Sequence, residues 1–316
     1  MLFRSCLAVE TGPNPPSPRP GSDQALAGRR MLLAEDNPVN QEVARSMFEM
    51  LGAKLDVVPD GRRAVAAALE RSYDMIFMDC QMPEMDGFTA VGLIREHERR
   101  ANSDAGSSTG SRGRRVIVAL TAHARKEDRE RCLAAGMDDY VSKPFDRDQL
   151  RTVAERWLPA AGSQVDAPAE SAAAGGRVGA PRDAEVARGA SERQDEGGEP
   201  AVNLTALDQI RSLQRPGAPS VLERVAKLYF TNTPDLLASM ATAIARADRE
   251  ALRQAAHTLK STSATLGAGR LARLCRETEE VARTGAPISE TSRVDSMQAE
   301  YERVRRDLLA VLEASS

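Results

Sequence analysis

Short apolar runs alternate with longer amphipathic segments through the first half of the chain. The runs lack polar alternation, so they predict strands that are covered on both faces. The expected strands are residues 29–34, 55–58, 73–78, 115–120 and 139–142, and the expected helices are residues 38–51, 62–71, 88–100, 126–135 and 146–157. Strictly alternating strands and helices predict an α/β doubly wound, parallel five-stranded sheet with right-handed crossovers.

The last third of the chain shows helical periodicity and no strand pattern. The expected helices are residues 204–213, 220–245, 249–266, 268–283 and 289–312. Short polar or Gly/Pro breaks join them, which favours antiparallel neighbours. We therefore expect a separate all-α antiparallel four-helix-bundle domain.

Two segments lack the large apolar residues that a packed core requires. Residues 1–28 open with an apolar stretch too short for a secretory signal and become Pro-rich, and residues 160–200 contain no aromatic residue, Leu, Ile or Met. We expect a disordered lead-in and a disordered linker, because such compositions cannot offset the entropy of ordering. These limits predict an α/β domain at 29–159 and a helical domain at 201–316. A Gly/Ser-rich stretch, residues 101–113, is expected to be a disordered insert.

Composition narrows the possible environments of the protein. Its 43 basic and 46 acidic residues give a net charge of −3, so no global positive excess indicates nucleic acid as a partner. No apolar run approaches the ~18 residues that span a bilayer. The four cysteines are scattered, which disfavours a disulfide framework or a zinc site. We expect a soluble, cytoplasmic chain with no membrane span.

Three acids follow two of the predicted strands. Glu35 and Asp36 come after the first strand and Asp79 ends the third. Sites in open parallel sheets form beyond the carboxyl ends of the strands, so these carboxylates should converge, at a cost that a cation would remove. All-oxygen ligands suit Mg²⁺. The alternative is that such acids merely cap helices, since Asn37–Pro38 is typical of a helix start.

Two further strand ends add a hydroxyl and an ammonium group. Asp79 lies in F-M-D-C-Q-M-P-E-M-D-G, Thr121 in V-A-L-T-A-H-A and Lys143 in D-D-Y-V-S-K-P-F. Together these motifs resemble a response-regulator receiver domain, especially those attached to hybrid histidine kinases. The resemblance covers residues 29–159 and implies the flavodoxin-like receiver fold.

The resemblance implies a role for each residue of this pocket. Asp79 would accept a phosphoryl group as an acyl phosphate, and Lys143 would pair with a phosphate oxygen. Thr121 would bond the phosphoryl group and let Tyr140 turn inward as a switch. The bond before Pro144 would be cis. The implied Mg²⁺ ligands are Glu35, Asp36, Asp79 and the backbone carbonyl of Gln81.

A hydrolase with an aspartate nucleophile is the enzymatic alternative. Such enzymes move the leaving-group proton with a second Asp two residues after the nucleophile. Here that position is Gln81, whose amide cannot act as a general acid or base near neutral pH. We therefore expect a metastable phospho-aspartate rather than turnover. We expect Cys80 to be a packing residue, and we expect His97 and His123 to be solvated.

One histidine in the helical domain stands out by its helical phase. Leu252, Ala255, Leu259, Thr262 and Leu266 form one apolar stripe of the predicted helix. His257 lies roughly 140–160° from Leu252 and Leu259. We expect its ring to point away from the core and to remain open to a partner.

The residues around His257 carry a second resemblance. The string A-H-T-L-K-S-T-S-A-T-L-G-A resembles a histidine-containing phosphotransfer (HPt) domain, over roughly residues 203–314. Many members have Gly directly after the Lys, where this chain has Ser261. The resemblance implies that His257 takes a phosphoryl group from one receiver aspartate and passes it to another, while Lys260 offsets its charge.

The two resemblances together predict a two-component phosphorelay protein. The order of receiver, linker and bundle matches the C-terminal half of an unorthodox hybrid histidine kinase. The sequence shows neither a P-loop nor the motifs of a histidine-kinase ATP lid, so we expect no kinase activity of its own. A separate histidine kinase, or an upstream portion, would supply the phosphoryl group, and a downstream response regulator would receive it.

Three alternatives remain beside this hypothesis. The chain could be a fragment of a hybrid sensor histidine kinase, or a scaffold with degenerate sites. It could also be a response regulator whose C-terminal helices bind DNA or a protein output partner. Residues 201–316 mix Arg with Asp and Glu and offer no uncompensated basic helix, which disfavours DNA.

The scarcity of lysine sharpens both predicted sites. Only five of the 43 basic residues are lysine, and two of these, Lys143 and Lys260, fall where a phosphoryl group should sit. A compact ammonium acts on phosphate as a point charge, whereas arginine serves the general surface. A flexible linker of about 41 residues spans roughly 35 Å, which would let the two sites of one chain meet.

Overall fold

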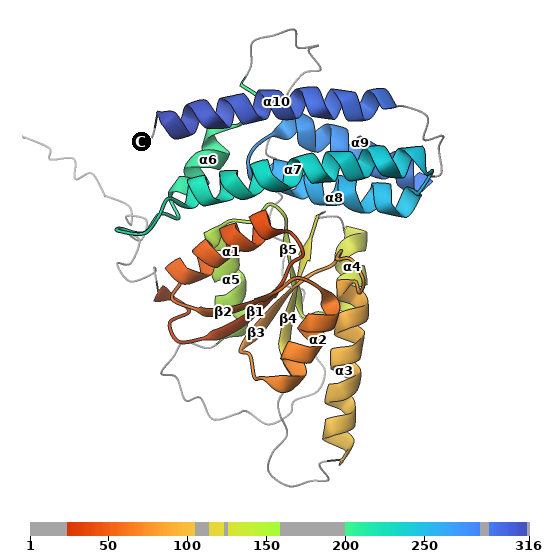
Figure 1. The fold of residues 1–316 in the computed structure, drawn as a ribbon. Coiled ribbons are helices and arrows are strands. Elements are labelled where there is room, and N and C mark those ends of the chain that lie inside the picture. Colours follow the sequence, from red (N-terminus) through yellow and green to blue (C-terminus); the bar gives the residue numbers. More distant parts are fainter. Residues whose placement is uncertain (1–23, 105–113, 123–125, 159–199, 285–290, 315–316) are drawn as a thin grey trace, which may run out of the picture.

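The computed structural model describes residues 24–104, 114–122, 126–158, 200–284 and 291–314. Figure 1 shows an α/β domain with a set of long helices lying across one end of it. The predicted disordered linker, residues 160–200, falls almost wholly outside the described residues, as do most of the lead-in and the insert. None of the helices in these described ranges is both long and apolar enough to cross a membrane.

The α/β domain is built on a five-stranded sheet. Its strands are β1 (Arg30–Ala34), β2 (Lys54–Val58), β3 (Met75–Asp79), β4 (Val116–Thr121) and β5 (Asp139–Ser142). All pair in parallel, in the order β2-β1-β3-β4-β5. Every residue of β3 is buried, because helices cover both faces of the sheet. The predicted doubly wound fold is confirmed.

Five helices flank the sheet. They are α1 (Pro38–Met50), α2 (Gly61–Glu70), α3 (Gly87–Asp104), α4 (Lys126–Ala134) and α5 (Arg147–Trp157). The predicted start of the insert at residue 101 is wrong, since α3 continues to Asp104. Polar residues and alanine can continue a helix without facing a core, and the Ser103 hydroxyl donates to the Arg100 carbonyl at 2.8 Å.

The end of the predicted disordered lead-in also belongs to the fold. Leu26 is only 2% exposed, and its backbone N–H donates to the carbonyl of Leu51 at 2.9 Å. This leucine covers the end of α1 next to the sheet. A single apolar residue achieves this burial, whereas the composition of residues 1–28 averages over many polar ones.

The helical domain has one short and four long helices. They are α6 (Leu204–Arg211), α7 (Val221–Ala245), α8 (Arg249–Thr265), α9 (Gly269–Thr284) and α10 (Thr291–Glu313). The predicted stripe of α8 is buried throughout. In the core, the rings of Tyr229 and Tyr301 meet edge to face with centroids 5.9 Å apart. Helices α7 and α8 lie over the end of the sheet where the strands terminate, and α1 contacts both.

The start of α3 constrains the end of β3, where Asp79 lies. A Cβ on Gly87 would come within 2.1 Å of the backbone oxygen of Asp79, whereas one on Gly92 would meet nothing within 4 Å. We predict that Gly87→Ala lowers the free energy of unfolding by about 1–3 kcal/mol through this overlap. Gly92→Ala, in the same helix, should raise it by about 0.5–1 kcal/mol. Urea denaturation followed by circular dichroism measures both, and equal stabilities would contradict the constraint.

Candidate functional site

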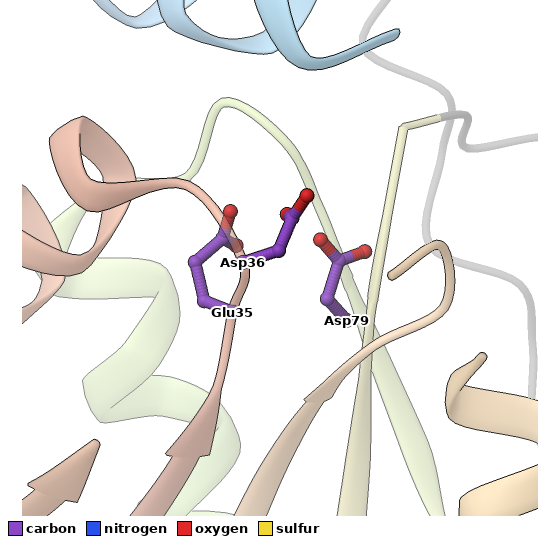
Figure 2. A group of neighbouring side chains, drawn as sticks. All are labelled: Glu35, Asp36 and Asp79. Carbon is purple, nitrogen blue, oxygen red and sulfur yellow. The ribbon is translucent and has the colours of Figure 1, made fainter. Parts of the chain in front are cut away.

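Three carboxyl groups converge where β1 and β3 end. Figure 2 shows Glu35, Asp36 and Asp79 grouped at these strand ends, below the helical domain. One oxygen of each lies within 4.8 Å of the others. Glu35 is 1% exposed and Asp79 is 3% exposed. Because β1 and β3 are neighbours in a parallel sheet, the predicted convergence follows directly from the strand order.

The acids are not needed to cap the helix that follows β1. Asn37 is the N-cap of α1, and its side-chain oxygen accepts from the backbone N–H of Val39 at 2.9 Å. Pro38 occupies the first turn, where its missing N–H costs nothing. The capping alternative therefore does not account for Glu35 or Asp36.

Lys143 joins two of the three carboxylates. Its Nζ lies 2.5 Å from Glu35 Oε2 and 2.6 Å from Asp79 Oδ2, and its side chain is 9% exposed. The residue follows β5, where its backbone N–H donates to the Thr121 carbonyl at 2.7 Å. The peptide bond to Pro144 is cis, as predicted. The ammonium group thus reaches Glu35 and Asp79 from the β5 edge of the sheet.

Burial dominates the ionisation of this cluster. It raises the pKa of Glu35 even though Lys143 opposes the shift. Burial and the nearby charges of Glu35 and Asp79 raise the pKa of Asp36 to about 7. Burial also acts against the charged form of Lys143, but attraction to Asp79 and Glu35 outweighs it and raises the pKa. One ammonium facing three carboxyl groups leaves an excess of negative charge that favours a cation.

The other predicted residues of this pocket lie close by. Thr121 is buried at the end of β4, and the backbone N–H of Gln81 donates to Asp79 Oδ1 at 3.0 Å. Tyr140 is half-buried on β5, with the guanidinium of Arg129 5.9 Å from its ring centroid. The switch and ligand roles of these residues stay predictions.

Cys80 and His97, for which no chemical role was expected, lie as predicted. Cys80 is buried, with its sulfur 3.7 Å from that of Cys132. His97 is exposed on α3. His123 lies outside the described residues.

His257 is not open to solvent, which corrects the expectation from helical phase. The residue is only 7% exposed. Its position on α8 is off the apolar stripe, but α9 lies against the same side of α8 and contributes a polar partner. Helical periodicity shows which residues share the apolar stripe of a helix. It cannot show that another helix packs against a different side.

That partner is Glu279, which the sequence pattern did not indicate. His257 Nδ1 lies 2.8 Å from Glu279 Oε1, and Lys260 Nζ lies 2.5 Å from Glu279 Oε2. A carboxylate can only accept, so Nδ1 is the ring nitrogen that donates to Glu279, and Nε2 takes no part in this contact. Glu279 stands on another helix among other Glu and Arg residues, and nothing in its spacing marks it. Only the packing of α8 on α9 does.

The same contacts set the ionisation of Glu279. Burial acts against its charged form, but the hydrogen bond and charge of His257, followed by those of Lys260, outweigh burial and lower the pKa to about 2. Lys260 Nζ also lies 3.4 Å from His257 Nδ1. The histidine therefore sits beside an ion pair that persists at neutral pH.

Asp36 of the acidic cluster and His257 line one cavity. Its volume is about 460 Å³, and its lining includes Asp36 and Gln81 of the α/β domain together with His257 and Thr258 of α8. Asp36 and His257, far apart in sequence, thus lie around a single space.

Comparison with known families agrees with this geometry. The response regulator receiver domain family matches residues 31–155, and the Hpt domain family matches residues 224–307. The α/β domain is therefore a response regulator receiver domain, and the bundle is an Hpt domain.

Two curated relatives are much longer than this chain. The chain is 41% identical over 159 residues to probable histidine kinase 1 of Oryza sativa subsp. indica, covering 44% of this chain and 16% of the relative. It is 30% identical over 263 residues to the sensor protein GacS of Pseudomonas syringae pv. syringae, covering 83% of this chain and 25% of the relative. The chain thus spans a quarter or less of the length of these two relatives.

Among solved structures, the receiver domain of the sensor histidine kinase PA1611 from Pseudomonas aeruginosa PAO1 is similar in sequence. It is 44% identical, the match covers 42% of this chain and 98% of that one, and the TM-score is 0.35. That receiver was crystallised with a magnesium ion coordinated in its active-site cleft.

The lowered pKa of Glu279 means that the pH dependence of stability tests its ion pair with Lys260. A carboxyl group whose pKa falls from 4.5 to about 2 on folding stabilises the protein above pH 4.5 and loses that contribution as the pH falls toward 2. We predict that Glu279→Gln removes up to about 3 kcal/mol of this pH dependence. Urea denaturation at a series of pH values measures it.

Glu280→Gln is the matched control for this test. Glu280 is the next residue on α9, and its side chain is 55% exposed in a pair with Arg283. Exposed pairs contribute little, so its variant should keep the wild-type slope. An unchanged slope in Glu279→Gln would show that the pair does not form.

Proposed function

We propose that this chain is an intermediate of a two-component phosphorelay, in which Asp79 accepts a phosphoryl group and His257 carries it onward. The observation that supports the proposal most directly is the shared cavity, which is lined by Asp36 of the acidic cluster and by His257. Each side also holds a lysine, Lys143 or Lys260, within reach of its predicted acceptor.

The acidic cluster fits a magnesium ion. Its donors are all oxygens, the carboxyl groups are buried, and a single ammonium leaves part of their charge unbalanced. Hard oxygen ligands of this kind suit Mg²⁺, which when bound neutralises charge on phosphoryl oxygens. We assign the ligands as Glu35, Asp36, Asp79 and the backbone carbonyl of Gln81.

At the receiver, a carboxylate oxygen of Asp79 attacks the phosphorus of a phosphohistidine. The O–P bond forms as the P–N bond breaks, and the electron pair returns to the donor imidazole. Lys143, already 2.6 Å from Asp79, is placed to pair with a phosphoryl oxygen. Thr121 then donates a hydrogen bond to the phosphoryl group, and Tyr140 turns inward, which changes the surface that partners contact.

At the bundle, Nε2 of His257 attacks the phosphorus of an aspartyl phosphate. The N–P bond forms as the O–P bond breaks, and the carboxylate is regenerated. Glu279 holds the Nδ1 proton and thereby orients the ring, while Lys260 offsets the added negative charge. Glu279 is a positioning residue here, because it acts through the histidine.

The wider assignment follows from these steps. We propose that the chain itself does not bind ATP, that a histidine kinase supplies the phosphoryl group, and that the receiver of a downstream response regulator takes it from His257. The full protein is then either a separate relay component or part of a longer hybrid histidine kinase acting in the cytoplasm. We propose domain limits of 29–159 and 201–316.

Phosphate lability tests the two acceptors. Given Mg²⁺ and a phosphorylated histidine kinase, the wild-type chain should carry base-labile label at Asp79 and acid-labile label at His257. Asp79→Asn should lose all label, whereas His257→Gln should keep the aspartyl phosphate. Gel autoradiography after acid or base treatment measures both.

Two controls match these variants. Asp208→Asn, whose side chain is 67% exposed on α6, and His97→Gln, exposed on α3, should label like the wild type. Label on His257 in the Asp79→Asn chain would show that the order of transfer is wrong.

A further inference from the structure

Helix α1 of the receiver carries a row of polar contacts to the Hpt bundle. Asn37 Nδ2 donates to the Thr258 carbonyl at 3.3 Å. Glu42 Oε1 lies 2.7 Å from Arg224 Nε of α7, and Glu49 Oε2 lies 3.8 Å from Arg215 Nη1. The acidic residues are on the receiver and the basic residues are on the bundle, so the two surfaces are complementary in charge.

Asn40 lies at the centre of this row and is 6% exposed. Its Nδ2 donates to Ser261 Oγ of α8 at 2.8 Å and to Glu35 Oε1 at 2.9 Å. Its Oδ1 accepts from Thr265 Oγ1 at 3.1 Å. One amide therefore joins a residue of the acidic cluster to the helix that carries the histidine. A bundle without these two hydroxyls would leave part of a buried amide unsatisfied.

The hydrogen bond from Asn40 requires the hydroxyl of Ser261. Glycine at this position, one residue after Lys260, would offer no hydroxyl to Asn40. The serine lies on α8 one turn after His257, so the hydrogen bond that recognises the receiver also sets the height of the histidine over the receiver's strand ends.

Apolar side chains extend the contact between the two domains, but a cavity remains among them. Val43 and Met47 of α1 belong to the same buried cluster as Ile210 and Leu213 of the bundle. A cavity of about 230 Å³ remains among these residues. Incomplete packing weakens a contact, which suits a bundle that must leave its receiver to meet another.

We propose that the receiver and bundle of this chain are docking partners, selected by the Asn40–Ser261 hydrogen bond and the Glu42–Arg224 ion pair, so that the phosphoryl group passes from Asp79 to His257 within one chain. The inference rests on the proposed function and names the partner of its second step. The transfer itself is the exchange given above: the N–P bond to His257 forms as the O–P bond to Asp79 breaks.

The concentration dependence of transfer separates this proposal from transfer between chains. After Asp79 is labelled with a small phosphoryl donor and Mg²⁺, the rate at which acid-labile label appears in the wild-type chain should not depend on protein concentration. A mixture of full-length Asp79→Asn and His257→Gln chains can transfer only between molecules. At micromolar concentration it should be at least about 100-fold slower, since a tether gives an effective concentration near the millimolar range.

Charge reversal tests the surface itself. Glu42→Arg and Arg224→Glu should each slow transfer within the chain about 10-fold, and the double variant should recover most of the rate because the pair is restored in reverse. Ser261→Gly should slow it as well. Glu70→Arg on α2, where the side chain is 73% exposed, is the matched control and should transfer like the wild type.

Two further measurements keep the outcomes apart. Labelling of Asp79 by the small donor should be unchanged in Glu42→Arg, and small-angle scattering should show that variant to be more extended than the wild type. A rate proportional to concentration, or single reversals without effect, would overturn the docking proposal while label on His257 still upheld the relay. If no label reached His257 in any arrangement, the relay and the docking proposal would both fail.

Discussion

The contact of Lys143 with Glu35 and Asp79 is the constraint on which the receiver's chemistry depends. Two buried carboxylates on neighbouring strands repel each other, and the ammonium group between them, 2.5 and 2.6 Å away, makes their arrangement tolerable. The contact needs β1 and β3 side by side and the loop after β5 turned back over them. The parallel strand order and the cap at Asn37 both help to hold these groups at one end of the sheet.

The bundle repeats the same arrangement of charge. Lys260 is paired with the buried carboxylate of Glu279, which in turn holds His257 by its Nδ1 proton. In both domains a lysine lies beside the proposed phosphoacceptor and is paired with a buried carboxylate. Arginine forms exposed pairs, such as that of Arg283 with Glu280, and also the buried pairs of Glu98 with Arg95 and Arg115.

The position of the bundle over the receiver links these two sites. The cavity between Asp36 and His257 exists because α8 crosses the ends of the strands, and α1 holds α8 there through Asn40. The amide of Asn40 also bonds to Glu35, so docking and the acidic cluster share one side chain. This contact consists of a few hydrogen bonds, an ion pair and partly filled apolar packing.

Local pattern determined much of this protein. Apolar runs and helical periodicity indicated the strands and long helices of the described residues. Strand-end motifs placed Glu35, Asp36, Asp79, Thr121 and Lys143 at one site, because parallel strands bring their carboxyl ends to the same edge. Tertiary structure alone decided what depends on distant neighbours. The burial of Leu26 and His257, the pairing of His257 with Glu279 and the contact of Asn40 with Ser261 all join segments that no periodicity relates. A short-range pattern shows which face of a helix is apolar, but only packing shows what lies against the other faces.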